Sequence, residues 1–509
     1  MIRIAKTENG MVRGLPGADP RVTVFKGIPF AAPPTGDNRW RAPQPCEDWE
    51  GIRDAFAFAP ISVQDTPGLG TDIYCREWHV DPEIPMSEDC LYLNVWTGAK
   101  DTDEKLPVLI WYFGGGFQWG YTAEMEFDGE RLARRGVIVV SVNYRLGALG
   151  FMAHPELTAQ QPLTPTNFGC LDQQAGLKWV IRNIAAFGGD PERITLAGQS
   201  AGGASVLAQI NCPDNEGLFQ RATVFSGMIR SPYVEDAFIT PGSLEKAEAK
   251  GIDFLKALGV RTIAEARKLD AMYIRDRYAE YAKDHPRMSI CIDGHFCPGD
   301  PMRRYMRGEC IQVPLMAGNT EDEFPNTITA VTEEEYRDSV QEIFGQKAQR
   351  FLDFPEARRM AAQGQYAPVS GIECTVKSAF LQDEREGRCC RNYYYRFAPH
   401  IPGWDHPGTF HSVDLWFFFE TLGKCWRPFT GKHYDLARQM CNYWVNFIKT
   451  GDPNGEDGDG SRMLEWEAYT ADHPCEMVFT TEGPAPGREK DSPFMRFLTE
   501  HLTEKLTQN

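Results

Sequence analysis

The stretch FGGDPERITLAGQSAGGASVLAQ (residues 187–209) decides how the fold of this chain is interpreted. Its apolar run RITLA (193–197) predicts a buried strand, and the small residues from Ala201 to Gln209 predict a helix. Between them, residues 198–202 have the pattern G-x-S-x-G. In this setting the pattern predicts a sharp turn that holds Ser200 in a strained conformation at a helix N-terminus, where the helix dipole favours developing negative charge.

The pattern by itself is weak evidence, because chance produces it in about one chain in six of this length. The alternative interpretation is a glycine-rich turn that contains an ordinary serine. The strand predicted before Ser200 and the helix predicted after it disfavour that alternative. We therefore interpret Ser200 as a candidate nucleophile.

Strand and helix signals alternate on both sides of this motif. Residues 171–186 predict a helix that the FGGDP turn ends. The further strand candidates, all short apolar runs, are Leu106–Tyr112, Val137–Val142, Ala222–Phe225, Val313–Ala317 and Asn392–Phe397. This alternation predicts the α/β class, with a central, mostly parallel sheet flanked by helices.

Two charged segments interrupt the alternation, residues 231–310 and 331–390. Both are rich in helix formers and contain few strand signals. We expect them to cap the sheet as helical excursions. The chain is then predicted to form one domain over residues 1–509.

The composition sets broad limits on function. With 509 residues, of which 42% are hydrophobic and 24% charged, the chain can build a large packed core. Its net charge of −18 disfavours a nucleic-acid partner, because neutralising phosphates requires clustered Lys and Arg. No apolar run is long enough to span a membrane, and the first residues lack the apolar core of a secretory signal. We expect a cytoplasmic protein.

No sequence feature predicts a metal site or a cofactor. The 14 cysteines are scattered, and no Cys or Cys/His cluster has zinc spacing. The acidic loop at 451–460 fails as a calcium loop, because Asp457 stands where the sharp-turn Gly should be and Met463 where the bidentate Glu should be. We expect no metal and no cofactor.

A second glycine-rich segment, Gly114-Gly115-Gly116-Phe117, follows the strand candidate Leu106–Tyr112. A tetrahedral oxyanion needs preorganised donors, and the bare backbone of such a loop can turn its N–H groups toward a substrate oxygen. The N–H of Ala201, directly after the candidate nucleophile, is a further donor. A flexible loop is the alternative interpretation. A dinucleotide fingerprint is excluded, because Trp119 stands where the last Gly of G-x-G-x-x-G should be.

The base of a serine hydrolase is a histidine, and in this chain order the acid precedes it. Among ten histidines, His411 lies in GTFHSVDLWFFF (408–419), after the last strand candidate of the alternation and before an aromatic run. His406 is the nearest rival, but the following Pro407 and its polar surroundings favour a surface turn. The acid candidates occupy AGNTEDEF (317–324), and spacing alone leaves three of them open: Glu321, Asp322 and Glu323.

Several long segments resemble the type-B carboxylesterase and cholinesterase family, in family order over nearly the whole chain. They are FKGIPFAAPPTGDNRWRAPQP (25–45), SEDCLYLNVW (87–96), VNYRLGALGF (142–151), NFGCLDQQAGLKWV (167–180) and FGGDPERITLAGQSAGG (187–203). The resemblance implies an α/β-hydrolase fold with helical insertions over the active site. It also implies hydrolysis of a small-molecule carboxylic ester without a metal or cofactor.

The same resemblance selects among the open candidates. In the family's acid motif the Glu lies five residues after a Gly, which selects Glu323 after Gly318, and the His-x-x-Asp-Leu motif selects His411. The implied catalytic triad is therefore Ser200, Glu323 and His411. The implied oxyanion hole consists of Gly115, Gly116 and Ala201.

The chain departs from the family pattern at several positions. Phe113 stands where many relatives have a His, and Gln199 stands where cholinesterases carry a Glu, which removes a charge beside the nucleophile. Ile61 stands where secreted relatives have a disulfide cysteine, so Cys90 lacks its usual partner. Cys75 is an alternative partner for Cys90, but free thiols are expected in a reducing compartment.

These departures bear on the substrate. Trp78 is only loosely similar to the cholinesterase tryptophan that binds a quaternary ammonium. The predicted pocket walls are Phe117, Trp119, Phe324 and Trp416, which favour small to medium apolar or aryl esters. Two alternatives are a choline esterase, disfavoured by Gln199, and a non-catalytic binding or adhesion protein of the same fold, disfavoured by the intact triad.

Overall fold

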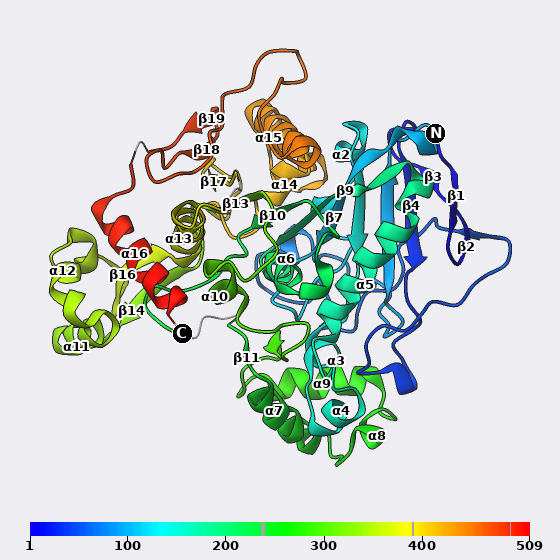
Figure 1. Ribbon diagram of the computed structural model, residues 1–509, viewed down its shortest axis with the longest axis horizontal. Coiled ribbons are helices and arrows are strands. Elements are labelled where there is room, and N and C mark those ends of the chain that lie inside the picture. The colour runs from blue at the N-terminus through cyan, green and yellow to red at the C-terminus, as the bar shows by residue number, and fades with distance from the viewer. Residues whose placement is uncertain (236–239, 389–390, 489, 509) are drawn as a thin grey trace.

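A large sheet with helices on both faces forms the centre of the computed structural model, which describes residues 1–235, 240–388, 391–488 and 490–508 (Figure 1). The strands from β18 to β8 all pair in parallel, whereas the strands at the two edges pair antiparallel. This arrangement confirms the predicted mostly parallel sheet. In spatial order its 11 strands are β19 (Gly483–Pro486), β18 (Glu476–Thr480), β17 (Tyr393–Phe397), β13 (Leu315–Thr320), β10 (Arg221–Phe225), β9 (Gly189–Gln199), β7 (Leu106–Tyr112), β8 (Ile138–Val142), β6 (Tyr92–Thr97), β4 (Thr23–Pro29) and β3 (Leu15–Pro16).

Successive side chains of the central strand β7 enter two different hydrophobic cores. Leu109 and Trp111 belong to one core, and Val108, Ile110 and Tyr112 belong to the other. Because side chains alternate across a strand, a strand with helices on both faces must be apolar at every position. The continuous run LPVLIWY satisfies that requirement.

Strand boundaries follow the sequence closely. β7, β8, β10 and β17 begin and end within one residue of the predicted positions. β13 begins at Leu315, later than predicted, because Pro314 has no N–H to donate to a neighbouring strand, and it ends at Thr320 instead of Ala317. β9 spans Gly189–Gln199 and extends beyond the predicted run 193–197 at both ends.

The helices cover both faces of the sheet (Figure 1). The α6 residues Val206 and Ile210 lie in the same core as Ile110, while the α15 residues Trp444 and Phe447 lie in the core that contains Trp111. No helix among the residues that the structure describes is long and apolar enough to cross a membrane. The helices are α1 (Tyr74–Glu77), α2 (Glu130–Arg134), α3 (Gly147–Phe151), α4 (Pro155–Gln160), α5 (Phe168–Asn183), α6 (Ala201–Asn211), α7 (Leu244–Ala257), α8 (Ile263–Ala266), α9 (Ala271–Tyr281), α10 (Pro301–Met306), α11 (Glu333–Phe344), α12 (Ala348–Leu352), α13 (Gly371–Arg385), α14 (Leu415–Phe418), α15 (Gly431–Thr450) and α16 (Pro493–Thr507).

The two charged segments contain α7–α10 and α11–α13, and residues 236–239 and 389–390 within them lie outside the described part of the chain. α7 and α9 lie together near one end of the molecule, and α11 and α12 lie at another (Figure 1). The second segment also holds strands that its sequence pattern does not predict. β15 (Met360–Ala362) and β16 (Gln365–Ser370) form a hairpin that pairs with β14 (Pro325–Thr329). The sequence feature that indicates this hairpin is the turn Gln363-Gly364, in which Gly364 has a φ of +75°.

Two smaller sheets complete the fold. The N-terminal sheet has the order β1 (Ile4–Thr7), β2 (Gly10–Arg13) and β5 (Ile52–Asp54). A short parallel pair, β11 (Gly242–Ser243) and β12 (Cys291–Ile292), connects the two ends of the segment that carries α7 and α9.

Candidate active site

Ser200 occupies the predicted turn between β9 and α6, and the structure confirms that the turn is strained. Its φ of 55° and ψ of −121° lie in a region that residues with a side chain rarely adopt, at a cost of about 1–3 kcal/mol. The Ser200 N–H donates to the carbonyl of Phe225 (2.9 Å), and its carbonyl accepts from Ala204 (2.9 Å). Only glycine fits at position 202, since a Cβ there would lie 2.0 Å from the carbonyl oxygen of Tyr112.

A buried ion pair joins the two loops that follow β13 and β17. His411 donates from Nδ1 to Oε2 of Glu323 over 2.6 Å, and the two side chains are 7% and 1% exposed. The other oxygen of Glu323 accepts from the backbone N–H of Thr320 (3.3 Å). Of the three acid candidates, Glu323 is the one that the structure brings to His411.

Asp322 and Glu321 have other partners. The Asp322 carboxylate accepts from the backbone N–H of Thr409 (2.8 Å), and the backbone N–H of Asp322 donates to the Thr409 hydroxyl (3.1 Å). This exchange fastens the acid loop to the histidine loop. Glu321 forms an ion pair with Arg396 toward the surface, and His406 is exposed in a left-handed conformation.

The charges of the pair shift both pKa values. Burial alone would lower the pKa of His411, but the adjacent Glu323 carboxylate, and more weakly Asp414, raise it above its ordinary value. Burial alone would raise the pKa of Glu323, yet the charge and hydrogen bond of His411 hold it below its ordinary value. The arrangement therefore stabilises an imidazolium that faces a carboxylate.

Nε2 of His411 has an unexpected partner. The side-chain amide of Gln199 lies 3.0 Å from it, and because Nδ1 carries the proton donated to Glu323, Nε2 accepts from Gln199. The Ser200 hydroxyl makes no hydrogen bond in the part of the chain that the structure describes. From the sequence, Gln199 was notable only for a missing charge. No local sequence pattern predicts its contact with His411, which is 212 positions away.

The glycine loop (residues 113–120) lies against the serine turn. A Cβ on Gly114 would lie 3.2 Å from Cβ of Ser200, and one on Gly115 would lie 2.2 Å from the carbonyl oxygen of Trp119. Gly115 and Gly116 have φ values of 98° and 61°. Among the described residues, the N–H groups of Gly115, Gly116 and Ala201 donate no hydrogen bond, so they are available to a substrate oxygen.

The predicted pocket walls have different environments. Phe117 and Trp416 are almost fully buried, where Phe117 packs on Phe151 and Trp416 packs on Trp78. Phe324 is 65% exposed, and its ring centroid lies 5.0 Å from that of His411. Trp119 lines a cavity next to the glycine loop.

Asp414 is a further buried acid near the ion pair, and it was not among the predicted site residues. Burial raises its pKa to about 6, and its Oδ2 accepts from the hydroxyl of Tyr395 (2.6 Å). The sequence feature that could have indicated Asp414 is its position three residues after His411, a spacing that can bring the two side chains to the same region.

A mostly parallel sheet with a strained serine at the carboxyl end of a central strand defines an α/β-hydrolase. Solved structures of this class superpose on almost the entire chain. A carboxylesterase of Geobacillus stearothermophilus gives a TM-score of 0.75 at 28% identity, covering 97% of this chain and 99% of that chain. A second structure, a PNB esterase, gives 0.77 at 28% identity and covers 98% of this chain and 100% of the other.

Sequence comparison gives the family. The chain is 33% identical over 494 residues to the para-nitrobenzyl esterase of Bacillus subtilis, covering 92% of each protein. The model of the carboxylesterase family matches residues 2–368 and 372–492. The chain belongs to this family, and it is a serine hydrolase of carboxylic esters.

Proposed function

We propose that this carboxylesterase acts through a triad of Ser200, His411 and Glu323 and an acyl-enzyme intermediate. The observation that carries the proposal is the buried 2.6 Å contact between His411 and Glu323, which leaves Nε2 as an acceptor beside the serine turn. The proposed substrates are small to medium apolar or aryl esters. No metal or other cofactor takes part in the proposed steps.

The first half-reaction forms the acyl-enzyme. Nε2 of His411 exchanges its hydrogen bond with Gln199 for one with the Ser200 hydroxyl, takes the proton, and Ser200 attacks the ester carbonyl. His411 then gives this proton to the leaving alkoxide. Water repeats the sequence in the second half-reaction and releases the acid. Throughout, Glu323 fixes the tautomer of His411 and stabilises its charged form.

The oxyanion formed in each half-reaction is proposed to bind the N–H groups of Gly115, Gly116 and Ala201. Those donors are fixed before the substrate arrives, and removal of one such donor typically costs on the order of 10²–10³ in rate. Phe324 exposes its ring beside His411, which favours an apolar or aryl group there.

The first prediction concerns the titration of His411. A fluorophosphonate should label Ser200 and no other serine. The labelling rate should fall as the pH drops through the pKa of His411, because only a neutral imidazole accepts the serine proton. In Gln199→Glu a carboxylate lies near Nε2 and stabilises the imidazolium, so the pKa rises and the acidic limb moves to higher pH. The measurement is the labelling rate from pH 4 to 9, with mass-spectrometric assignment of the labelled residue.

Gln341→Glu is the matched control, because it makes the same change on the surface of α11, where Gln341 donates to the carbonyl of Gly345 (3.1 Å). Its pH profile should coincide with that of the unmodified protein. An acidic limb that stays in place in Gln199→Glu would show that Gln199 and His411 do not meet in solution.

The second prediction concerns substrate charge. Gln199 places no charge beside the nucleophile, and Trp78 is only 4% exposed beneath Phe410, so neither offers a quaternary ammonium a binding surface. The global charge of −18 acts only over long range, and physiological salt screens it beyond about 8 Å. We expect phenyl acetate to have a kcat/KM at least equal to that of acetylcholine at ~0.15 M salt. A preference for acetylcholine that persists at high salt would contradict this expectation.

A further inference from the structure

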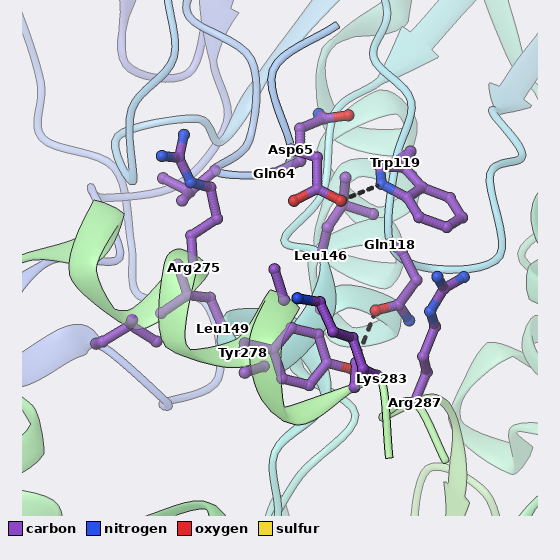
Figure 2. A pocket seen from close by; sticks show the side chains of 16 residues that line it. Gln64, Asp65, Gln118, Trp119, Leu146, Leu149, Arg275, Tyr278, Lys283 and Arg287 are labelled. Atoms are coloured by element: carbon purple, nitrogen blue, oxygen red, sulfur yellow. Dashed lines mark hydrogen bonds between the residues drawn. The ribbon is translucent and has the colours of Figure 1, made fainter. Parts of the chain in front are cut away.

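A basic cavity of about 150 Å³ lies beside the glycine loop (Figure 2). One side is lined by residues 63–65, by Gln118 and Trp119 of the glycine loop and by residues 146–149, and the other side is lined by α9 and the residues after it. The described lining residues include three basic side chains, Arg275, Lys283 and Arg287, and one acidic side chain, Asp65. The chain as a whole has a net charge of −18, so this positive lining is a local feature of opposite sign.

Arg287 is oriented but has no carboxylate partner in the described part of the chain. Its guanidinium lies over the ring of Trp119, 4.3 Å from the centroid. Trp119 is itself fixed, because its indole N–H donates to Asp65 over 2.9 Å. Stacking holds the plane of a guanidinium and leaves its N–H groups free to donate to an anion.

The other two basic side chains have only surface partners. Arg275 pairs with Asp276 (2.6 Å) and Lys283 pairs with Glu280 (2.5 Å), and both acids are more than 60% exposed. Exposed pairs of this kind contribute little to stability, so their cations can turn toward a ligand at small cost.

The cavity wall is continuous with the proposed oxyanion donors. Gln118 accepts from the hydroxyl of Tyr278 (3.0 Å), and its amide donates to the carbonyls of Gly116 (3.1 Å) and Met288 (2.8 Å). The backbone N–H of Trp119 donates to the carbonyl of Gly115 (3.0 Å). Gln118 and Trp119 therefore connect the cavity to the loop whose N–H groups are proposed to bind the ester carbonyl.

We propose that this cavity binds a carboxylate carried by the ester, so that the preferred substrates are esters with a free anionic arm. The inference rests on the proposed function and names its substrate class. A guanidinium matches the geometry of a carboxylate, and apolar lining from Leu146, Leu149 and Ile274 suits a methylene stem. A cavity of ~150 Å³ accommodates a group about the size of benzene, which is large enough for a short carboxylate arm.

The test compares esters that differ only in charge. The 4-nitrophenyl monoester of adipic acid and its terminal amide carry the difference on the acyl side; 4-acetoxybenzoate and 4-acetoxybenzamide carry it on the alcohol side. The measured quantity is the ratio of kcat/KM for the acid to kcat/KM for the amide. Since hydrogen bonds to charged groups contribute roughly 1.5–3 kcal/mol, the ratio should reach about tenfold or more in at least one pair.

Variants assign the preference to the cavity. In the double variant Lys283→Gln/Arg287→Gln the ratio should fall toward one, and in Arg287→Glu it should fall below one, because the acid then meets a like charge. Arg53→Gln is the matched control: Arg53 also lies over a tryptophan ring, that of Trp49, but in the N-terminal sheet, and its ratio should equal that of the unmodified protein. The ratio is taken within one preparation, so partial loss of folded enzyme cancels.

The outcomes separate this inference from the function on which it rests. If the ester bonds of the amide-bearing compounds are hydrolysed and the kcat/KM ratios are near one in both pairs, the inference is overturned and the proposed function stands. A high ratio that the double variant retains also overturns it, because the anion is then recognised elsewhere. If none of the four esters is hydrolysed, the proposed function is overturned.

Discussion

Replacement of Ser200 by alanine is expected to lower kcat for ester hydrolysis by about 10⁴-fold or more, because the members of a triad act as a unit. The fold should survive the change. The Ser200 hydroxyl makes no hydrogen bond among the described residues, and alanine meets the same backbone strain as serine at a φ of 55°. Steady-state hydrolysis of phenyl acetate measures the loss, and thermal unfolding measures the stability.

Ser339→Ala makes the same substitution in α11 and should retain full activity. The two proteins should be purified side by side so that a contaminating host esterase is recognised in both. Turnover in Ser200→Ala close to that of Ser339→Ala would show that another residue is the nucleophile.

The second large effect is expected for Glu323→Gln. A neutral amide neither stabilises the imidazolium nor fixes the tautomer that donates from Nδ1, so kcat should fall by orders of magnitude, about 10⁴-fold in the comparable case of a serine protease. KM for the same ester should change far less. The variant also removes the charge that raises the pKa of His411, so the acidic limb of its residual activity should move to lower pH.

Glu321→Gln is the matched comparison, two residues away in the same loop. It removes an ion pair with Arg396 on the surface and should leave kcat nearly unchanged. The reverse order of effects would assign the acid to Glu321 and contradict the proposed role of Glu323.

Local patterns predicted much of the sheet. The run at 106–112 is apolar at every position because helices cover both faces of β7, and G-x-S-x-G predicted the strained turn because glycines flank the one residue that must turn sharply. What the sequence left open was set by contacts between distant segments. Glu321, Asp322 and Glu323 are equivalent by spacing, and it is the exchange of hydrogen bonds between Asp322 and Thr409 that orients the loop.

The same limit applies to the surroundings of the site. Gln199 meets His411 only after the sheet has brought two distant loops together. The basic cavity joins α9 to residues 63–65, which are about 200 positions apart in the chain, and neither segment alone carries a recognisable motif. The hairpin of β15 and β16 was missed for a different reason, because its strands are short and its neighbours are strong helix formers.

The conformation of Ser200 sets activity and stability against each other at one codon. Glycine adopts a φ of 55° without steric strain, whereas serine stores about 1–3 kcal/mol there. The serine codons AGU and AGC are a single base change from a glycine codon, so a lineage released from selection for ester hydrolysis has a short mutational route to a more stable and inactive scaffold. With Ser200 as the proposed nucleophile, selection for ester hydrolysis would oppose this loss, which stability alone would favour.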